Sequence, residues 1–310
     1  MNGYFAALVA VLIWASYPVA TRAGVTGSFT AEDLITLRFG VGALLFLPYL
    51  LMHFRAIPRD AWVRGLPLTL FQGAGMGALV ICGLQFAPAS HQAALGPGVC
   101  SVWVALLGFL VFAKRPSPRV VVGAALCTLG VLVLTSWGAA KHNPAVLAGD
   151  AMFLAASALG ALYLLQLRSW GVSAMQAAAI VTVYSGLIVV PWHLWSAPEP
   201  LWRVAPAELL WQTLWQGVLI GCVALIALNH ATTRLGAERS SALVALVPVL
   251  SAILGLLFLG EVPSNAEITA ILAISAGVSI SASLSRQPGF HQRADEASGL
   301  RAVATRIARL

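Results

Sequence analysis

The chain has 310 residues, of which 59% are hydrophobic and 9% are charged. Soluble globular domains carry about a quarter charged residues, so this composition excludes a protein that water surrounds on all sides. The net charge of +7 lies mostly between apolar runs, which indicates membrane orientation rather than binding of nucleic acid.

Ten apolar runs follow one another along the sequence, and each is long enough to cross the hydrocarbon core of a bilayer as a helix. The runs are continuous and lack the alternation of barrel strands, so we predict an all-α integral membrane protein with ten transmembrane helices. The first run has no basic segment before it, and we interpret it as a span rather than a cleaved signal peptide. The runs cover residues 3–21, 34–52, 66–87, 89–113, 120–137, 151–167, 174–195, 209–232, 237–259 and 268–284.

The basic residues are distributed unevenly between the two sets of connections. Fourteen of the 18 Lys and Arg residues lie in the connections on the N-terminal side of the membrane or in the tail. Only Arg22, Lys141 and Arg203 lie in the opposite connections, and Arg38 falls within the second run. By the positive-inside rule, both termini are predicted to be cytoplasmic.

The two halves of the chain repeat each other at an offset of 144 to 147 residues. Each half contains five runs, an odd number, so the second half must enter the membrane from the opposite side, which predicts two inverted repeats. We therefore predict a first five-helix repeat over residues 1–143, a second over 144–285 and a basic cytoplasmic tail over 286–310. The matching motifs are Gly3 and Arg22 with Gly149 and Arg168, Gln72-Gly73 with Gln216-Gly217, and Leu107-Gly108 with Leu254-Gly255.

Four features of the sequence stand out together. They are Trp14 in the aromatic first run, Leu37-Arg38-Phe39 in the second run, and the run ends at 112–116 and 259–263. With the arrangement of five plus five runs, they resemble the drug/metabolite transporter superfamily. The two halves look like paired EamA domains, and the whole looks closest to YddG-type exporters of aromatic amino acids. The resemblance implies metabolite export across a bacterial inner membrane. One departure is that the first half has Ala113-Lys114 where the second half has the family's Gly260-Glu261.

Polar side chains within the apolar runs are candidates for substrate contacts, because uncompensated polar groups are costly in a bilayer. Arg38 either extends toward the lipid headgroups or faces a cavity and attracts a substrate carboxylate. Gln72 and Gln216 occupy matching positions, where they either bind a zwitterion or join helices. His230 is a further candidate contact, whereas His91 begins the fourth run and is interpreted as an interfacial residue.

Deep aromatic residues are the second group of candidates for the substrate site. Trp14 and Tyr17 are three residues apart and share a helix face, and Trp103 and Tyr163 also lie deep in their runs. Packing against lipid or neighbouring helices is the alternative for each. A cavity lined by such rings favours an aromatic or bulky apolar substrate by stacking.

Prolines and paired glycines within the runs are predicted to shape the helices. Proline disturbs helix hydrogen bonding and forms kinks or gates, and glycines at GxxxG spacing allow close packing, which we expect within each half. These residues are Pro18, Pro97 and Pro248, and the pairs Gly73/Gly77 and Gly217/Gly221.

The sequence contains no HExxH pair, P-loop or GxSxG elbow, so it predicts neither an enzyme nor a metal or cofactor site. The carboxylates lie at run ends, in connections or in the tail, which disfavours proton coupling through a mid-membrane carboxylate. The predicted function is export of amino acids, aromatic ones favoured, and related metabolites by alternating access. The expected partners are this small-molecule substrate and the lipid bilayer. A broad drug or metabolite exporter and a non-transporting scaffold are the alternatives, and monomer and dimer stay open.

Overall fold

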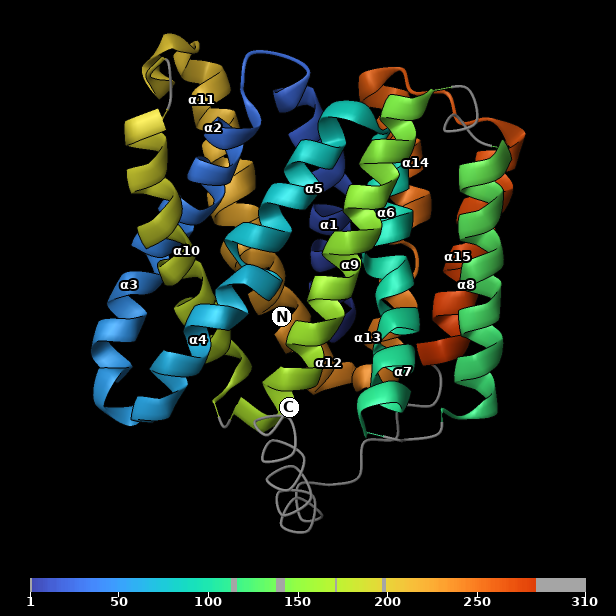
Figure 1. Ribbon diagram of the computed structural model, residues 1–310, viewed down its shortest axis with the longest axis horizontal. Coiled ribbons are helices and arrows are strands. Elements are labelled where there is room, and N and C mark those ends of the chain that lie inside the picture. The colour runs from blue at the N-terminus through green and yellow to red at the C-terminus, as the bar shows by residue number, and fades with distance from the viewer. Residues whose placement is uncertain (1, 113–115, 138–142, 171, 197–198, 283–310) are drawn as a thin grey trace.

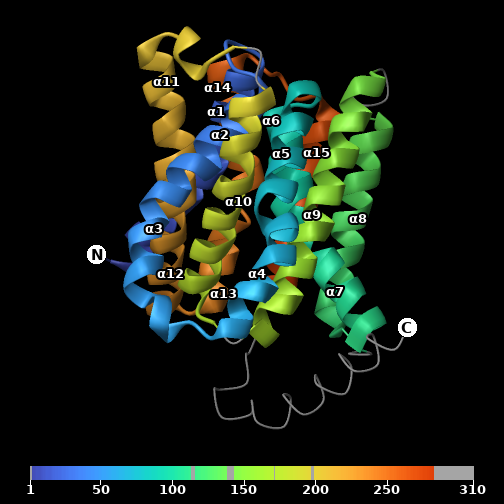
Figure 2. The ribbon, with the colours of Figure 1, turned by 60° about the vertical axis from the view of Figure 1, so that its left-hand side comes forward.

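A computed structural model describes the chain over residues 2–112, 116–137, 143–170, 172–196 and 199–282. Every regular element in these ranges is a helix, and eight helices are long and apolar enough to cross a membrane. The last two predicted runs overlap with the shorter apolar helices Val247–Leu259 and Asn265–Ser281. The long helices run up and down side by side (Figures 1 and 2). An all-helical membrane fold is therefore confirmed over the described residues.

The first half of the chain begins with well-capped helices. Asn2 caps the first helix by accepting a hydrogen bond from Tyr4 N at 3.2 Å. Thr30 and Asp33 form a capping box, in which the Asp33 carboxylate accepts from Thr30 N at 2.8 Å. The elements are α1 (Gly3–Val25), α2 (Ala31–Thr36), η1 (Leu37–Val41), α3 (Gly42–His53), η2 (Phe54–Ala56), α4 (Arg59–Gln72), α5 (Ala74–Phe86), α6 (Ala89–Ala93), η3 (Ala94–Gly98), α7 (Val99–Phe112) and α8 (Pro118–Trp137).

A glycine turn near the end of the second half positions a charged residue. Gly260 has a φ of 67°, a left-handed conformation that glycine adopts without strain. The turn is closed by Glu261 N, which donates to Gly255 O at 3.2 Å. The elements of this half are α9 (Pro144–Trp170), α10 (Ala174–Ser196), η5 (Leu201–Arg203), α11 (Pro206–Gln212), η6 (Thr213–Val223), α12 (Ala224–Leu235), α13 (Ala237–Val244), α14 (Val247–Leu259) and α15 (Asn265–Ala282).

Helix irregularities recur at nearly the same offset in the two halves. Gly73, with a ψ of −125°, separates α4 from α5, and Gly217 lies in the π-helical segment η6. Pro97 lies in the π-helical segment η3, and residues 245–246 separate α13 from α14. Pro18, in contrast, lies within the continuous helix α1. Only part of the proline prediction therefore coincides with an irregular backbone.

The closest helix packing joins the two halves. α1 packs on α12, α3 on α10, α5 on α9 and α8 on α15. Small residues make these approaches possible: a Cβ on Gly123 of α8 would lie 2.5 Å from Gly277 O of α15. The two halves therefore form one interleaved bundle rather than two separate ones.

The predicted packing of the GxxxG pairs within each half is wrong for two of the four glycines. A Cβ on Gly217 would lie 2.5 Å from Val41 Cβ, and one on Gly73 would lie 3.0 Å from Val181 Cγ1, in each case in the opposite half. Gly77 packs on Phe39 of its own half, as predicted. The reason is that the tightest helix pairs come from different halves, so small residues are needed most at those contacts.

The two ends of the bundle differ in charge. Helices α1, α5, α10 and α14 end on one side of the bundle, which we call the acidic end (Figure 1). Helices α3, α9 and α12 end on the opposite side, which we call the basic end. Among the described side chains, the acidic end carries Glu32, Asp33, Asp150, Glu199, Glu208, Glu261, Glu267, Arg22 and Arg203. The basic end carries Arg55, Arg59, Arg64, Arg119, Arg234, Arg239 and Asp60.

Candidate functional site

Arg38 lies in the π-helical segment η1, inside the candidate span Ala31–Ala56. Its Nη1 donates a hydrogen bond to Tyr17 Oη on α1. The guanidinium carbon lies 4.8 Å from the centroid of the Tyr17 ring and 5.6 Å from that of Phe39. No carboxylate of the described residues forms an ion pair with Arg38. A cation held between aromatic rings inside a span is suited to attract an anionic group.

Other predicted site residues lie in the same region of the bundle. Tyr17 belongs to a buried cluster against which Trp103 and Met76 pack. Met76 Sδ lies 3.4 Å, and Gln72 Oε1 3.7 Å, from the place that a Cβ on Gly160 would occupy. Trp103 Nε1 is buried and lacks a hydrogen-bond partner within the described ranges. The fold thus places the Arg38 guanidinium, the rings of Tyr17 and Trp103 and the Gln72 amide in the same part of the bundle.

The two matched glutamines have different surroundings. Gln216 is fully buried, and its Nε2 donates to Thr21 Oγ1 at 2.9 Å and to Gln212 Oε1 at 3.3 Å. Gln72 is half-buried at the end of α4. Gln216 therefore joins η6 to α1 in this structure, whereas Gln72 is the more accessible of the pair.

The remaining predicted contacts lie in other parts of the bundle. Trp14 packs against a small cluster that contains Val11 and Val247. Tyr163 is 7% exposed and packs in a separate core cluster with Ile180. His230 is half-buried on α12. These three residues do not join the direct contact between Arg38 and Tyr17.

At the acidic end, Arg22 and Glu261 join the two halves. Arg22 Nε donates to Glu261 Oε1, and Arg22 Nη1 donates to Leu84 O and Ala87 O, both at 2.7 Å. The second carboxylate oxygen, Glu261 Oε2, accepts from Ala89 N at 3.0 Å. Sequence alone placed Arg22 in a connection, but it lies in the last turn of α1. Gly260-Glu261 stood out as a motif in the sequence, but this motif did not predict the pairing of Glu261 with Arg22.

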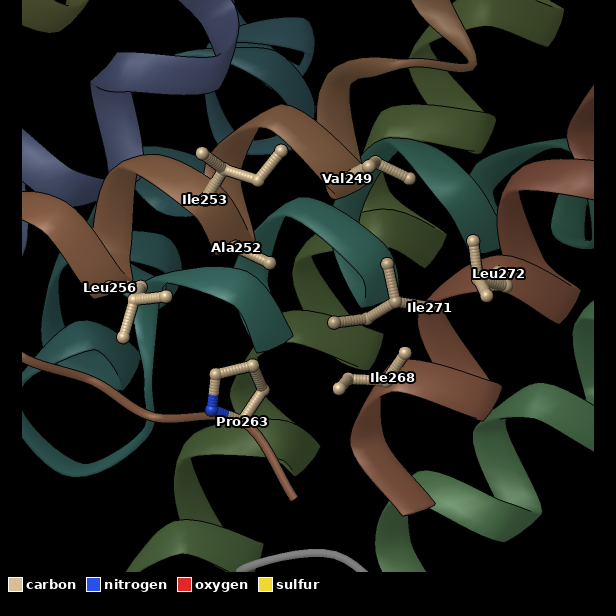
Figure 3. Close-up of a pocket in the computed structure, with 8 residues that line it drawn as sticks. All are labelled: Val249, Ala252, Ile253, Leu256, Pro263, Ile268, Ile271 and Leu272. Carbon is tan, nitrogen blue, oxygen red and sulfur yellow. The ribbon is translucent and has the colours of Figure 1, made fainter. Parts of the chain in front are cut away.

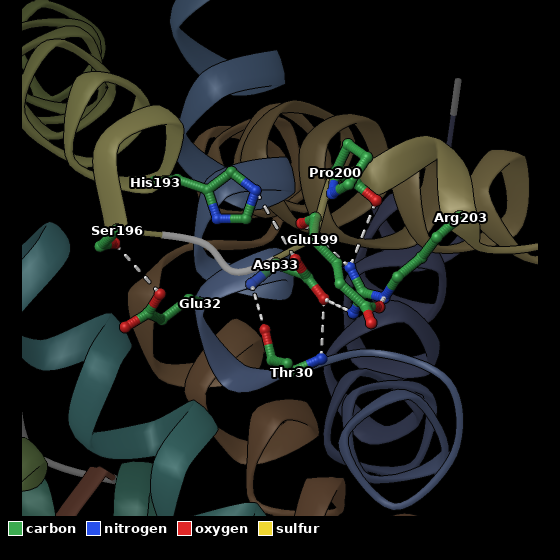
Figure 4. Close-up of polar contacts among 8 residues, drawn as sticks. All are labelled: Thr30, Glu32, Asp33, His193, Ser196, Glu199, Pro200 and Arg203. Carbon is green, nitrogen blue, oxygen red and sulfur yellow. Dashed lines mark hydrogen bonds and ion pairs between the residues drawn. The ribbon is translucent and has the colours of Figure 1, made fainter.

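A second ion cluster at the acidic end is centred on Asp33 (Figure 4). Asp33 is 1% exposed, and its Oδ2 accepts from Arg203 Nη2 at 2.6 Å, while His193 Nε2 lies 3.6 Å from Oδ1. Arg203 Nε also pairs with Glu199 at 3.0 Å. The hydrogen bond to Asp33 raises the pKa of the Arg203 guanidinium above its ordinary value. The Arg203 guanidinium therefore stays charged near neutral pH.

A third cluster surrounds His91, and it corrects the interpretation of this residue as interfacial. His91 is fully buried, with Asp150 and Glu267 beside its two ring nitrogens. The carboxylates belong to α9 and α15, which are distant in sequence from α6. In the sequence, His91 lies next to a short connection, which indicated access to water. Its burial depends on helices that are distant in the sequence, so the local sequence could not reveal it.

The basic end is joined across the halves by neutral contacts. Trp170 Nε1 donates to Ala61 O at 3.0 Å, and Tyr184 Oη donates to Trp62 O at 3.1 Å. The ion pair between Arg64 and Asp60 is local, at 3.4 Å within one turn of α4. No ion pair between two described side chains joins the halves at this end.

An apolar groove of about 270 Å³ lies between α14 and α15 (Figure 3). It has no polar side chain in its lining, so it is unsuited to an amino acid or any other charged ligand. Its lining residues are Val249, Ala252, Ile253, Leu256, Pro263, Ile268, Ile271 and Leu272.

The sequence matches the EamA-like transporter family over residues 1–136 and 147–283. The threonine/homoserine exporter RhtA of Salmonella typhimurium (strain LT2) is 28% identical over 272 residues, which cover 84% of this chain and 85% of that exporter. RhtA of Escherichia coli (strain K12) is 29% identical over 255 residues, covering 79% and 80%. The EamA resemblance is therefore confirmed, but these relatives are named for threonine and homoserine rather than for aromatic amino acids.

A solved crystal structure of another protein has the same fold. It aligns with a TM-score of 0.62 at 21% identity, covering 92% of this chain and 99% of that one. At this identity the likeness concerns the arrangement of helices alone.

Proposed function

Because the chain belongs to the EamA-like transporter family, we propose that it exports amino acids from the cytoplasm by alternating access. The observation that carries the substrate class is the contact of Arg38 with Tyr17, which holds a guanidinium inside a span without an ionic partner in the described chain. A guanidinium binds carboxylates well because its planar N–H groups match the two oxygens. The name of the RhtA relatives supports an amino acid as the cargo.

We infer that the chain crosses a bacterial inner membrane ten times, with both termini in the cytoplasm. α14 alone has 13 residues, about 20 Å of helix, which is shorter than the hydrocarbon core. Together α13 and α14 extend from Ala237 to Leu259 and are long enough for the ninth crossing. The arginines of the basic end favour its placement in the cytoplasm. A fused reporter after Leu310 that is active only in the periplasm would contradict this topology.

The packing pairs support two inverted repeats over residues 1–143 and 144–285. Each helix of one half has a counterpart at the matching position of the other half. Replacing both helices of the pair α1–α12 by their counterparts gives α9–α5, and the same replacement turns α1–α14 into α9–α7. All four pairs are in contact. The pairs α3–α10 and α8–α15 map onto themselves. Contacts that survive the exchange are those expected for a two-fold axis in the membrane plane. Alternating access then follows from the motion of one half against the other.

We place the substrate between the halves, beside η1. Arg38 binds the substrate carboxylate, Tyr17 and Trp103 contact its side chain, and Gln72 accepts a hydrogen bond from its ammonium group. The other candidate contacts are proposed to line the path on either side of this centre. They are Trp14, Tyr163, Gln216 and His230.

Two observations favour different side chains on the transported amino acid. Aromatic residues around Arg38 favour an aromatic amino acid by stacking, whereas the relatives are named for small hydroxylated ones. We propose that aromatic amino acids are transported best and that threonine and homoserine are also accepted. A broad exporter of cationic drugs is the second candidate, but Arg38 would repel such cargo.

Counterflow into liposomes that contain the purified protein tests this function. Vesicles loaded with an unlabelled amino acid should accumulate labelled phenylalanine, tryptophan, threonine or homoserine, and should not accumulate a cationic dye. Accumulation of the dye alone would identify a drug exporter, and the absence of any exchange would indicate a non-transporting protein.

Substitution at Arg38 tests the placement of the site. Arg38→Gln should reduce the rate of amino acid exchange by about tenfold or more, because a charge-assisted hydrogen bond contributes about 1.5–3 kcal/mol. Arg55→Gln, at an exposed arginine of the basic end, is the matched control and should exchange normally. Wild-type exchange by Arg38→Gln would contradict the placement but not the function.

A further inference from the structure

His91 lies between two carboxylates in the interior of the acidic end, and the transport steps proposed above give this cluster no role. His91 Nδ1 is 2.8 Å from Asp150 Oδ1, and His91 Nε2 is 2.9 Å from Glu267 Oε1. The side chains of His91 and Asp150 are 0% exposed, and that of Glu267 is 7% exposed. His91 comes from the first half and both carboxylates come from the second, so the cluster is part of the contact between the halves.

The two short contacts of His91 together require two protons. Each nitrogen–oxygen contact requires one hydrogen between its two atoms. Either His91 is an imidazolium between two carboxylates, or it is neutral and one carboxyl group is protonated. Both arrangements hold two protons, and both leave the three groups with a net charge of −1.

One carboxylate oxygen of the cluster, Asp150 Oδ2, is available to bind a third proton. Glu267 Oε2 accepts from Ser264 N at 2.7 Å, whereas Asp150 Oδ2 is buried without a hydrogen-bond partner among the described residues. A buried anionic oxygen without a hydrogen-bond donor is energetically costly. Protonation of Asp150 Oδ2 would remove the net charge of the cluster without breaking either contact to His91.

Among the described residues, no lysine or arginine forms an ion pair with Asp150. Arg22 on α1 is already paired with Glu261, whose other oxygen accepts from Ala89 N at the start of α6. The described charges on α4, α8 and α13, which pack on α9 or α15, lie at the basic end. The other titratable groups of the packed elements are the thiols Cys82, Cys100 and Cys127 and the phenols Tyr4, Tyr17 and Tyr163.

We propose that His91, Asp150 and Glu267 form a proton-binding site that couples amino acid export to proton entry, an inference that rests on the proposed function. When the acidic end opens, a proton from water binds Asp150 Oδ2 and the net charge of the cluster changes from −1 to 0. After that end closes, the proton leaves along α9 toward the middle of the bundle. Ser157, two helical turns further along the same face of α9, donates to Gly96 O at 2.7 Å and supplies a hydroxyl group on this route.

This site differs from the mid-membrane carboxylate that the sequence lacks. The carboxylates lie near the starts of α9 and α15, and the fold buries them by packing these helices around α6 and η3. The periplasmic placement proposed for the acidic end would give the site access to the compartment from which protons enter. An exporter that exchanges protons for its cargo needs access of this kind.

Proton flux through the wild-type protein is the first test. Liposomes loaded with threonine or phenylalanine and the pH indicator pyranine are diluted into amino-acid-free buffer, with valinomycin and potassium holding the membrane potential at zero. Outflow of the amino acid should acidify the lumen, and vesicles without amino acid should not acidify. Counterflow without acidification would overturn this inference alone, whereas absent counterflow would overturn the proposed function.

Two variants and a matched control locate the site. Asp150→Asn and Glu267→Gln should each reduce the ratio of proton flux to amino acid flux at least fivefold. Asp33→Asn is the control, because Asp33 is also a buried carboxylate near a histidine at the same end, and it should keep the wild-type ratio. Loss of coupling in Asp33→Asn alone would overturn the assignment. If neither cluster variant exchanges amino acids, the wild-type measurement decides. Wild-type exchange without proton flux would still overturn the inference, and proton flux that depends on the amino acid would support it.

Discussion

The acidic end and the basic end join the same two halves by different chemistry. At the acidic end, ion clusters centred on Glu261, Asp33 and His91 each include residues from both halves. At the basic end, Trp170 and Tyr184 donate neutral hydrogen bonds to backbone carbonyls. Separating buried charges leaves each of them unpaired, whereas a neutral hydrogen bond is exchanged for one to water at small net cost. The contact between the halves at the acidic end is therefore expected to be the harder of the two to separate.

The largest effect is expected from Glu261→Ala. This change removes the ionic partner of Arg22 and the acceptor for Ala89 N. The free energy of unfolding should fall by about 3 kcal/mol, because a half-buried guanidinium is left unpaired. Titration with sodium dodecyl sulfate in mixed micelles measures it. Glu208→Ala, at an exposed carboxylate of the same end, is the control, and equal stability of the two variants would remove the distinction between the ends.

The contact between the π-helical segments can be tested with Gly217→Ala. A new Cβ would lie 2.5 Å from Val41 Cβ, so η1 and η6 must move apart. Overpacking of this kind costs about 2 kcal/mol. Gly108→Ala, with no atom within 4 Å of the new Cβ, should be neutral or slightly stabilising. The same unfolding titration compares the pair, and a neutral result at Gly217 would show that the two halves are less tightly packed there.

At the basic end, Trp170→Phe should cost about 1 kcal/mol. The change leaves Ala61 O without its donor while most of the buried ring volume remains. Trp195→Phe, at a residue that is 80% exposed, is the control and should be close to neutral. If Trp170→Phe lowered the free energy of unfolding as much as Glu261→Ala, the contacts between the halves would be equally strong at the two ends.

The smallest effect is expected from Arg203→Lys, at about 0.5 kcal/mol. Arg203 contacts Asp33 and Glu199 with different nitrogen atoms, and a single ammonium group retains only one of these contacts in good geometry. Arg59→Lys, at an exposed arginine of the basic end, is the control. The thermal unfolding midpoint should fall by about a degree or two in Arg203→Lys only. A loss as large as that in Glu261→Ala would mean that Asp33 depends on both contacts.

The helical fold could be predicted because bilayer burial makes every span a continuous apolar run. The breaks within spans could not be predicted as firmly, since Gly73 interrupts a helix whereas Pro18 does not. Whether a backbone stays helical at such residues depends on the neighbouring helices, which satisfy or displace its hydrogen bonds. Equally, the side on which Gly217 packs depends on which half lies opposite, and no local pattern contains that information.

For the candidate site, sequence spacing could suggest residues that share a helix face but not the contacts that they make. Trp14 and Tyr17 share a helix face by spacing, but only the fold shows that Tyr17, and not Trp14, contacts Arg38. The burial of His91 was missed because its partners are 59 and 176 residues away in the chain. Ionic contacts across such separations are fixed by helix packing, which sequence periodicity does not report.

The helix breaks at Gly73 and at residues 245–246 each separate two short helices, α4 from α5 and α13 from α14. A helix that reaches only half of the membrane can tilt while the helix in the other leaflet stays packed. Under the alternating access proposed above, the two ends of the bundle would therefore not need to move in concert, and an occluded intermediate, sealed on both sides around its cargo, would be geometrically accessible. Such a carrier would leak little, because its passage would never open to both compartments at once.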